Sequence, residues 1–278
     1  MFRDYSTGAY YREPPQREGE GWQSWITRGA NFAIIYTRAM AGAAITGNFQ
    51  DEHFAYALDG GVIVTARGEE RRLGDEDLAI VPPGDWRIRF EKESSLLQMV
   101  TADEGIAALA ANQALYADGA PEVAPIDPWP EPTNGYRLRH YSTLEGYRRG
   151  GLVHAYRTRK LMMVPYPRFL EPRDETQLSP HAHADFEQGS VALEGEWQHY
   201  LRVPWTANRR EWKPDATVEI GSPSTTIIPA GVIHTSQGMA GAGMRLVDVF
   251  APPRMDFSER GWVDNADEYP MPPIVAEA

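Results

Sequence analysis

The stretch PHAHADFEQ at residues 180–188 and the stretch PAGVIH at residues 229–234 carry the strongest signal in this sequence. His181 and His183 stand one residue apart, so on an extended segment both imidazoles point to the same side. A side-chain oxygen follows within the first stretch, and His234 follows a Pro-x-Gly turn in the second. Three imidazoles and one oxygen are a typical ligand set for a divalent transition metal. The sequence therefore predicts a metal site.

These two stretches resemble the sequence motifs of the cupin superfamily, whose members are small β-barrels of the jelly-roll type. The first cupin motif is His-x-His, then Glu after three or four residues, then Gly after six more. His181, His183 and Gly195 match it, with Gln188 at the position of the Glu. The second motif centres on Pro-x-Gly-x-x-His, which residues 229–234 match. The resemblance covers roughly residues 160–255.

Three departures from the cupin pattern accompany this match. Gln188 replaces the usual Glu, Gly238 stands where an Asn often follows the last His, and Pro223 stands where a glycine precedes the turn. The identity of the oxygen ligand is therefore open. The spacing to the turn glycine selects Gln188, whereas the shorter gap after His183 selects Glu187, whose charge makes it the better ligand for a divalent cation.

The chain reads as two similar halves, and the resemblance implies an all-β fold of two cupin barrels. Residues 74–87 look like the second motif without its histidine. We expect an N-terminal barrel without a metal site over residues 1–125 and a C-terminal metal-binding barrel over residues 126–278. Residues 102–116 are rich in helix-forming residues and predict a short linking helix.

The N-terminal half keeps one histidine among the four positions that align with metal ligands, and those positions hold Thr46, Asn48, His53 and Arg87. One imidazole does not hold a transition metal well. This half is then a packing partner that supports a dimer. The alternative is a regulatory or substrate-sensing pocket that uses His53, Trp86 and Arg87.

Composition limits the function classes. The chain has 278 residues, a net charge of −12 and no cysteine. The negative charge argues against nucleic acid or an anionic membrane surface as a partner. Without cysteine there is no thiolate nucleophile and no disulfide framework. The opening residues lack the apolar core of a signal peptide, and no run approaches a membrane span. We therefore expect a cytoplasmic protein, and as a cupin a homodimer.

Further candidate residues follow from their neighbourhood. His199 is a candidate general base, because an unperturbed imidazole titrates near neutrality, and a barrel-wall position is the alternative. Glu187, if it is not a ligand, is a candidate acid–base residue beside the metal. Ser190 shares the face of Gln188, since side chains alternate along a strand. Asp248 sits among apolar residues, and a buried carboxylate there needs a partner such as an arginine.

The resemblance implies a metal-dependent enzyme with a small-molecule substrate. Three neutral histidines resemble the triads of cupin dioxygenases, in which Fe(II) binds a chelating organic substrate and dioxygen. The alternative is a redox-neutral lyase or isomerase of a sugar acid, which the amide of Gln188 favours. A ligand-binding barrel without catalysis is the third possibility. Fe(II) is the favoured metal, with Mn, Ni or Zn as alternatives, because such sites bind several divalent metals.

Overall fold

The computed structural model describes residues 2–273, and in this range the chain folds almost entirely into β-strands. Residues 274–278 of the expected C-terminal domain lie outside the described part. The α-helices found among the described residues are α1 (Thr143–Arg148) and α2 (Met255–Glu259), each of fewer than two turns. The expected all-β class is therefore confirmed. No helix in the described range is long and apolar enough to cross a membrane.

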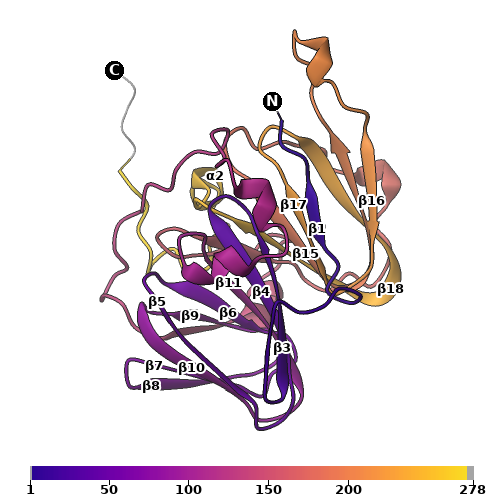
Figure 1. Cartoon of the computed structure of the whole chain (residues 1–278). Helices are drawn as coiled ribbons and strands as arrows, with labels where there is room; N and C mark the ends of the chain where they lie inside the picture. The colour runs from indigo at the N-terminus through magenta and orange to yellow at the C-terminus, as the bar shows by residue number, and fades with distance from the viewer. Residues whose placement is uncertain (1, 274–278) are drawn as a thin grey trace.

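The first half of the chain forms two antiparallel sheets that enclose an apolar core (Figure 1). The four-stranded sheet has the order β5-β10-β7-β8, and the seven-stranded sheet has the order β12-β9-β6-β11-β4-β3-β2. Their strands are β2 (Arg17–Gly19), β3 (Trp22–Arg28), β4 (Phe32–Ala39), β5 (Ala44–Phe49), β6 (His53–Ala57), β7 (Val62–Ala66), β8 (Glu69–Leu73), β9 (Asp77–Val81), β10 (Gly84–Phe90), β11 (Ser94–Thr101) and β12 (Arg139–Ser142).

The two sheets differ in how their faces are buried. Along β10, Ile88 and Phe90 point into the core, whereas Arg89 between them is exposed. This alternation is typical of a sheet with one face in water. Strand β11 is buried on both faces, because Leu96 joins the core between the sheets and Leu97 joins a second core on the other side. The seven-stranded sheet is therefore the central layer of the molecule.

The second half forms a sheet of seven strands, built around two long ones. Its order is β1-β17-β15-β18-β14-β13, and β16 pairs with β15. The strands are β1 (Ser6–Gly8), β13 (Tyr156–Arg157), β14 (Met162–Pro165), β15 (Gln188–Arg202), β16 (Ala216–Ile220), β17 (Ser224–Ile228) and β18 (Ile233–Phe250).

A bulged region divides the long strands β15 and β18. The register between them shifts from Ala192 to Trp197, and there β15 exchanges its neighbour β17 for β16. Gly195 has a φ of 88° in this region, and a Cβ atom there would lie 2.4 Å from Cγ of Met244. Only glycine fits such a position without strain. Because of this bend, β15 pairs with β17 before the bulged region and with β16 after it, while β18 pairs with β15 on both sides of the region.

The two halves pack against each other through an apolar interface and also exchange strands. Phe32 and Ile34 of β4 contact the layer that contains Val191 and Val249 of the second half. Strand β1 pairs with β17, although the two lie near opposite ends of the chain (Figure 1). Strand β12 pairs with β9. Each half therefore contributes one strand to a sheet of the other half. The domain boundary near residue 125 stays a prediction.

The expected linking helix is wrong in form. Residues 102–116 contain two 3₁₀ segments, η1 (Gly105–Leu109) and η2 (Gln113–Tyr116). Between them, the backbone N–H of Ala111 donates to the carbonyl of Ile26, and the side chain of Asn112 accepts from the N–H of Arg28. These tertiary hydrogen bonds to β3 override the helix propensity of the alanines.

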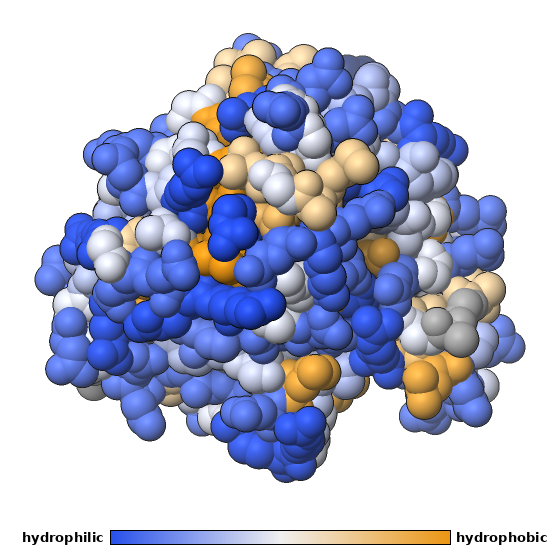
Figure 2. All heavy atoms as spheres, turned by 90° about the horizontal axis from the view of Figure 1, so that it is seen from below, coloured by the Kyte–Doolittle hydropathy of each residue, from blue (hydrophilic) through white to orange (hydrophobic). Residues whose placement is uncertain are grey.

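The outer surface is largely hydrophilic. Seen from below, apolar side chains break it in a few separate patches (Figure 2). Leu170 and Trp205 are the most exposed large apolar side chains, at 76% each, and Trp205 stacks on Trp212 in the hairpin between β15 and β16. The remaining 3₁₀ segments are η3 (Glu175–Gln177) and η4 (Arg209–Glu211). Most apolar side chains therefore lie in the cores.

Tyr10 joins the two halves by a buried hydroxyl. Its Oη lies 2.9 Å from Oγ1 of Thr27 in β3 and 2.8 Å from Oγ1 of Thr225 in β17. Tyr10→Phe is expected to lower the free energy of unfolding by about 1–2 kcal/mol, because both threonines lose a buried partner. Urea denaturation measures this. Tyr11→Phe, at an exposed ring, is the control and is expected to stay within about 0.5 kcal/mol of the parent; equal losses in both would contradict the prediction.

Candidate metal centre

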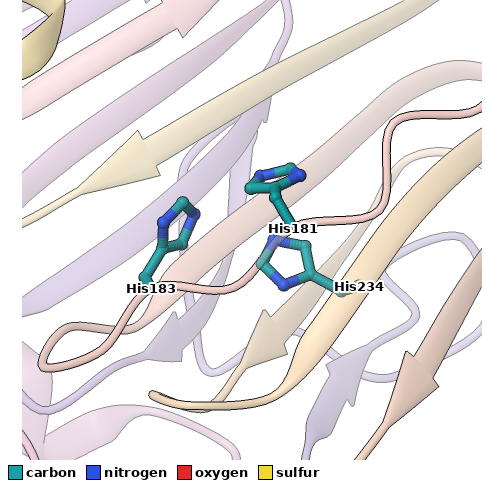
Figure 3. Close-up of side chains that lie close together, drawn as sticks. All are labelled: His181, His183 and His234. Atoms are coloured by element: carbon teal, nitrogen blue, oxygen red, sulfur yellow. The ribbon is translucent and has the colours of Figure 1, made fainter.

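The three motif histidines meet at the start of β15 and β18. His181 and His183 lie on the extended segment before β15, and His234 is the second residue of β18 (Figure 3). His181 and His234 form a β-bridge, with N–H to carbonyl distances of 3.0 and 2.8 Å. Directly paired residues project to the same face. The potential ligand nitrogens of all three rings consequently lie within 4.8 Å of one another.

Backbone carbonyls orient two of these rings. Nδ1 of His181 lies 2.9 Å from the carbonyl oxygen of Ser179, and Nδ1 of His234 lies 2.9 Å from that of Val232. A carbonyl only accepts, so each Nδ1 donates and each Nε2 keeps its lone pair. A carbonyl on the outer nitrogen is the usual support of a metal-binding histidine.

Burial keeps two of the imidazoles neutral. Loss of solvent lowers the pKa of His183 to about 3 and that of His234 to about 4. Neighbouring imidazoles and Arg254 also disfavour the charged forms. A metal ligand has to be unprotonated. The donor set therefore fits a divalent transition metal at neutral pH without displacement of a proton from these two rings.

The amide of Gln188 completes the cluster. Its Oε1 lies 3.0 Å from Nε2 of His183 and 3.3 Å from Nε2 of His234. Its Nε2 donates to Oγ of Ser190 at 2.9 Å, and that hydroxyl donates to Oδ1 of Asp248 at 2.6 Å. This chain of hydrogen bonds directs the amide oxygen toward the histidines. Three imidazole nitrogens and one oxygen thus face a common point.

Glu187 points away from the histidines. One carboxylate oxygen accepts from the backbone N–H of Ala30 at 2.5 Å, and the other accepts from the hydroxyl of Tyr116 at 3.1 Å. Burial raises the pKa of this carboxyl group. The structure thus does not bring Glu187 to the cluster, either as the oxygen ligand or as an acid–base residue. Glu187 instead ties the start of β15 to the first half of the chain.

His199 is fully buried beside the cluster. Its Nδ1 lies 2.8 Å from Oγ of Ser236, and its Nε2 has no partner. Burial, and secondarily His234, lowers its pKa to about 4. His199 is not among the residues that line the adjoining cavity. Its role as a general base stays a prediction, and the structure places it in the wall of the sheet.

A cavity of about 540 Å³ opens from the cluster. His181, Gln188 and His234 line it, and the segment from Tyr166 to His181 forms much of one wall. The apolar lining residues are Leu152, Val153, Tyr166, Phe169, Pro172, Trp197, Met244 and Leu246. Sequence reasoning missed this wall, because residues 167–180 have no regular pattern.

Asp248 lines the same cavity with partners other than the expected arginine. Oδ1 accepts from Ser190, and Oδ2 accepts from the hydroxyl of Tyr166 at 3.0 Å. The buried carboxyl group thus has partners, as expected, but they are two hydroxyl groups and not an arginine. The pKa of Asp248 is raised by burial, and that of Tyr166 is raised by burial and by Asp248.

No family model and no curated protein matches this sequence. Solved structures do resemble the fold. Protein Ylba from E. coli has a TM-score of 0.59 at 11% identity, over 91% of this chain and 93% of its own. The oxalate decarboxylase of Lactobacillus farciminis has a TM-score of 0.56 at 13% identity, over 89% and 86%. The chain therefore shares its overall fold with these two proteins. At these identities the likeness concerns the fold alone.

The motif histidines of the second half thus converge, whereas the positions of the first half that align with them do not form one pocket. His53 is fully buried, with its ring centroid 4.9 Å from that of Phe49 and 5.3 Å from that of Trp86. Arg87 lies on the exposed face of β10, next to the inward-pointing Trp86. The expected alternative pocket of His53, Trp86 and Arg87 is therefore not formed.

His53 makes the stability of this protein dependent on pH. Neither ring nitrogen has a partner, and burial lowers its pKa to about 3. The unfolded imidazole titrates near 6.5, so below that pH the unfolded state binds the additional proton. The contribution of neutral His53 to the free energy of unfolding is therefore fully present above about pH 6.5. It is lost toward pH 3, by at most about 1.4 kcal/mol per pH unit.

His53→Phe is expected to flatten this loss between pH 6 and pH 4, because phenylalanine keeps the ring contacts and binds no proton. Urea denaturation of the metal-free parent and variant at several pH values measures the difference in slope. Parallel loss of stability in the two proteins would contradict the prediction. Other buried histidines contribute equally to both curves.

Proposed function

We propose that this protein is a metal-dependent cupin enzyme that holds one divalent transition metal on His181, His183, Gln188 and His234. The observation that carries the proposal is the convergence of three imidazoles and one amide oxygen beside a cavity. A neutral ligand set leaves the full charge of the ion available for an anionic, chelating substrate. Fe(II) is the favoured ion, with Mn, Ni or Zn as alternatives.

The cavity favours a dioxygenase over a sugar-acid lyase or isomerase. Apolar and aromatic side chains form most of its exposed lining, with Phe169, Trp197 and Met244 among them, and polar side chains such as Gln177 and Ser236 border them. The apolar part suits an organic molecule with an apolar body better than a sugar acid, whose several hydroxyl groups each need a polar partner. An Fe(II) ion in the cluster would supply positions for a chelating substrate and for dioxygen. The protein's part is to orient the substrate against the histidines.

The finer architecture belongs to the same proposal. We propose that the halves 1–125 and 126–278 are two cupin barrels, with the metal in the second. The first half then supports the site mechanically, since Ala30 and Tyr116 hold Glu187 next to Gln188. A homodimer and a cytoplasmic location remain predictions.

The test is elemental analysis of protein purified without chelator and without a nickel column, followed by oxygen uptake after reconstitution with Fe(II). Catechols, diketones and sugar acids form the substrate panel. About one iron per chain and oxygen loss that depends on a catechol or diketone are expected. Turnover of a sugar acid without oxygen loss would replace the dioxygenase by the lyase or isomerase. Absence of any metal would leave a ligand-binding protein.

A further inference from the structure

Asp248 is a buried carboxylate at the substrate side of the proposed metal centre. It is 7% exposed and lines the cavity with His181 and Gln188. No arginine or lysine pairs with it among the described residues. A carboxylate in such a place is costly unless donors surround it. Two donors come from the protein, and the open side faces the cavity.

The hydrogen bonds around Asp248 fix it as an acceptor. The hydroxyl of Ser190 accepts from the amide of Gln188, so its own proton points to Oδ1 of Asp248. The hydroxyl of Tyr166 donates to Oδ2. Each carboxylate oxygen has a second lone pair, and a carboxylate donates nothing. A substrate group that meets Asp248 therefore has to be a donor.

The charged side chains around the cavity also favour a substrate group that donates a hydrogen bond. Glu171 and Asp174 line it together with Asp248. Arg173 is the only arginine or lysine among the described lining residues, and its guanidinium donates to the carbonyls of Ser236 and Gln177 and to the hydroxyl of Ser179. Those bonds hold the wall segment to β18 and direct three of the guanidinium's hydrogen bonds to protein oxygens.

We propose that Asp248, held by Ser190 and Tyr166, selects substrates that present a neutral hydroxyl beside the metal-binding oxygen and rejects substrates that present a second carboxylate. The substrate class is then an apolar molecule with vicinal hydroxyl groups or an enol next to a carbonyl group. Dicarboxylates and sugar acids are excluded by charge. The inference rests on the proposed metal centre and deepens it, because it concerns the same cavity.

The experiment uses holoprotein loaded with Zn(II), under nitrogen, so that binding is measured without turnover. Calorimetric titration with catechol and with phthalate compares two vicinal hydroxyls and two vicinal carboxylates on the same ring. In the parent protein we expect catechol to bind and phthalate to bind weakly. Asp248→Asn, which keeps the shape and removes the charge, is expected to weaken catechol about tenfold and strengthen phthalate, because a charge-assisted hydrogen bond is lost and a repulsion removed.

Two further variants make the result specific. Asp174→Asn removes a carboxylate that lines the cavity and bonds only within its own turn, and it is expected to change the ratio of the two affinities by less than about twofold. Tyr166→Phe keeps the charge of Asp248 and is expected to leave phthalate weak. Zinc content is measured for every variant, so that loss of the metal is recognised.

The outcomes separate this inference from the proposal on which it rests. An unchanged catechol-to-phthalate ratio in metal-loaded Asp248→Asn would overturn the selective role of Asp248 and leave the metal centre standing. Failure of the parent protein to bind zinc would overturn both. A parent protein that binds zinc and prefers phthalate would overturn the substrate class alone.

Discussion

Alanine in place of His234 is expected to weaken the binding of a divalent transition metal by more than about 100-fold and to abolish activity. Loss of a residue that merely supports a ligand costs 10–100-fold, and His234 is itself a proposed ligand. The fold is expected to persist, because the imidazole belongs to none of the apolar core clusters. Metal titration by calorimetry measures the affinity, and circular dichroism checks the fold.

The control for this prediction is another histidine of the same chain. His140 lies in β12, where its Nε2 is 2.8 Å from Asp77. His140→Ala is expected to leave the metal affinity within about twofold. The double variant of His181 and His183 to alanine is the strictest test, since it leaves His234 as the one imidazole of the cluster. One metal per chain retained in that variant would disprove the site.

The second large effect concerns the oxygen ligand. Gln188→Ala is expected to weaken metal binding about tenfold or more, because the variant lacks the oxygen that faces His183 and His234. Glu187→Ala is expected to leave metal affinity within about threefold. It is expected to lower stability by about 1–3 kcal/mol instead, since Ala30 N–H and the Tyr116 hydroxyl lose a buried acceptor. Calorimetry and urea denaturation on the same samples separate the two effects.

A conservative change tests the same assignment from the other side. Gln188→Glu keeps an oxygen at the same reach and adds a charge, so it is expected to retain the metal. The reverse pattern, with metal lost in Glu187→Ala and kept in Gln188→Ala, would make Glu187 the ligand. It would also require the start of β15 to rearrange on metal binding.

Local sequence could predict most of the metal centre. His181 and His183 are two residues apart on an extended segment, and the Pro-x-Gly turn before His234 sets the entry to a strand. These are short-range features with a fixed geometry. Gln188 and Glu187 could not be separated in this way, because β15 begins only at Gln188 and the chain bends at Asp185. The alternation of a strand does not extend across that bend.

Long-range contacts escaped prediction for the same physical reason. The alanines of residues 102–116 favour a helix, but hydrogen bonds to β3 produce two 3₁₀ segments. Asp248 was expected to have a partner such as an arginine, and its donors Ser190 and Tyr166 come from two other segments of the chain.

The sequence by itself determined the three histidines of the site, through turn residues and the spacing of the two motifs, and it determined the all-β class through the resemblance of those motifs to cupin motifs. Tertiary structure decided which oxygen faces the histidines, how the two halves exchange β1 and β12, and what lines the cavity. These depend on segments that meet across long loops, where packing and hydrogen-bond satisfaction act together and no local pattern records the outcome.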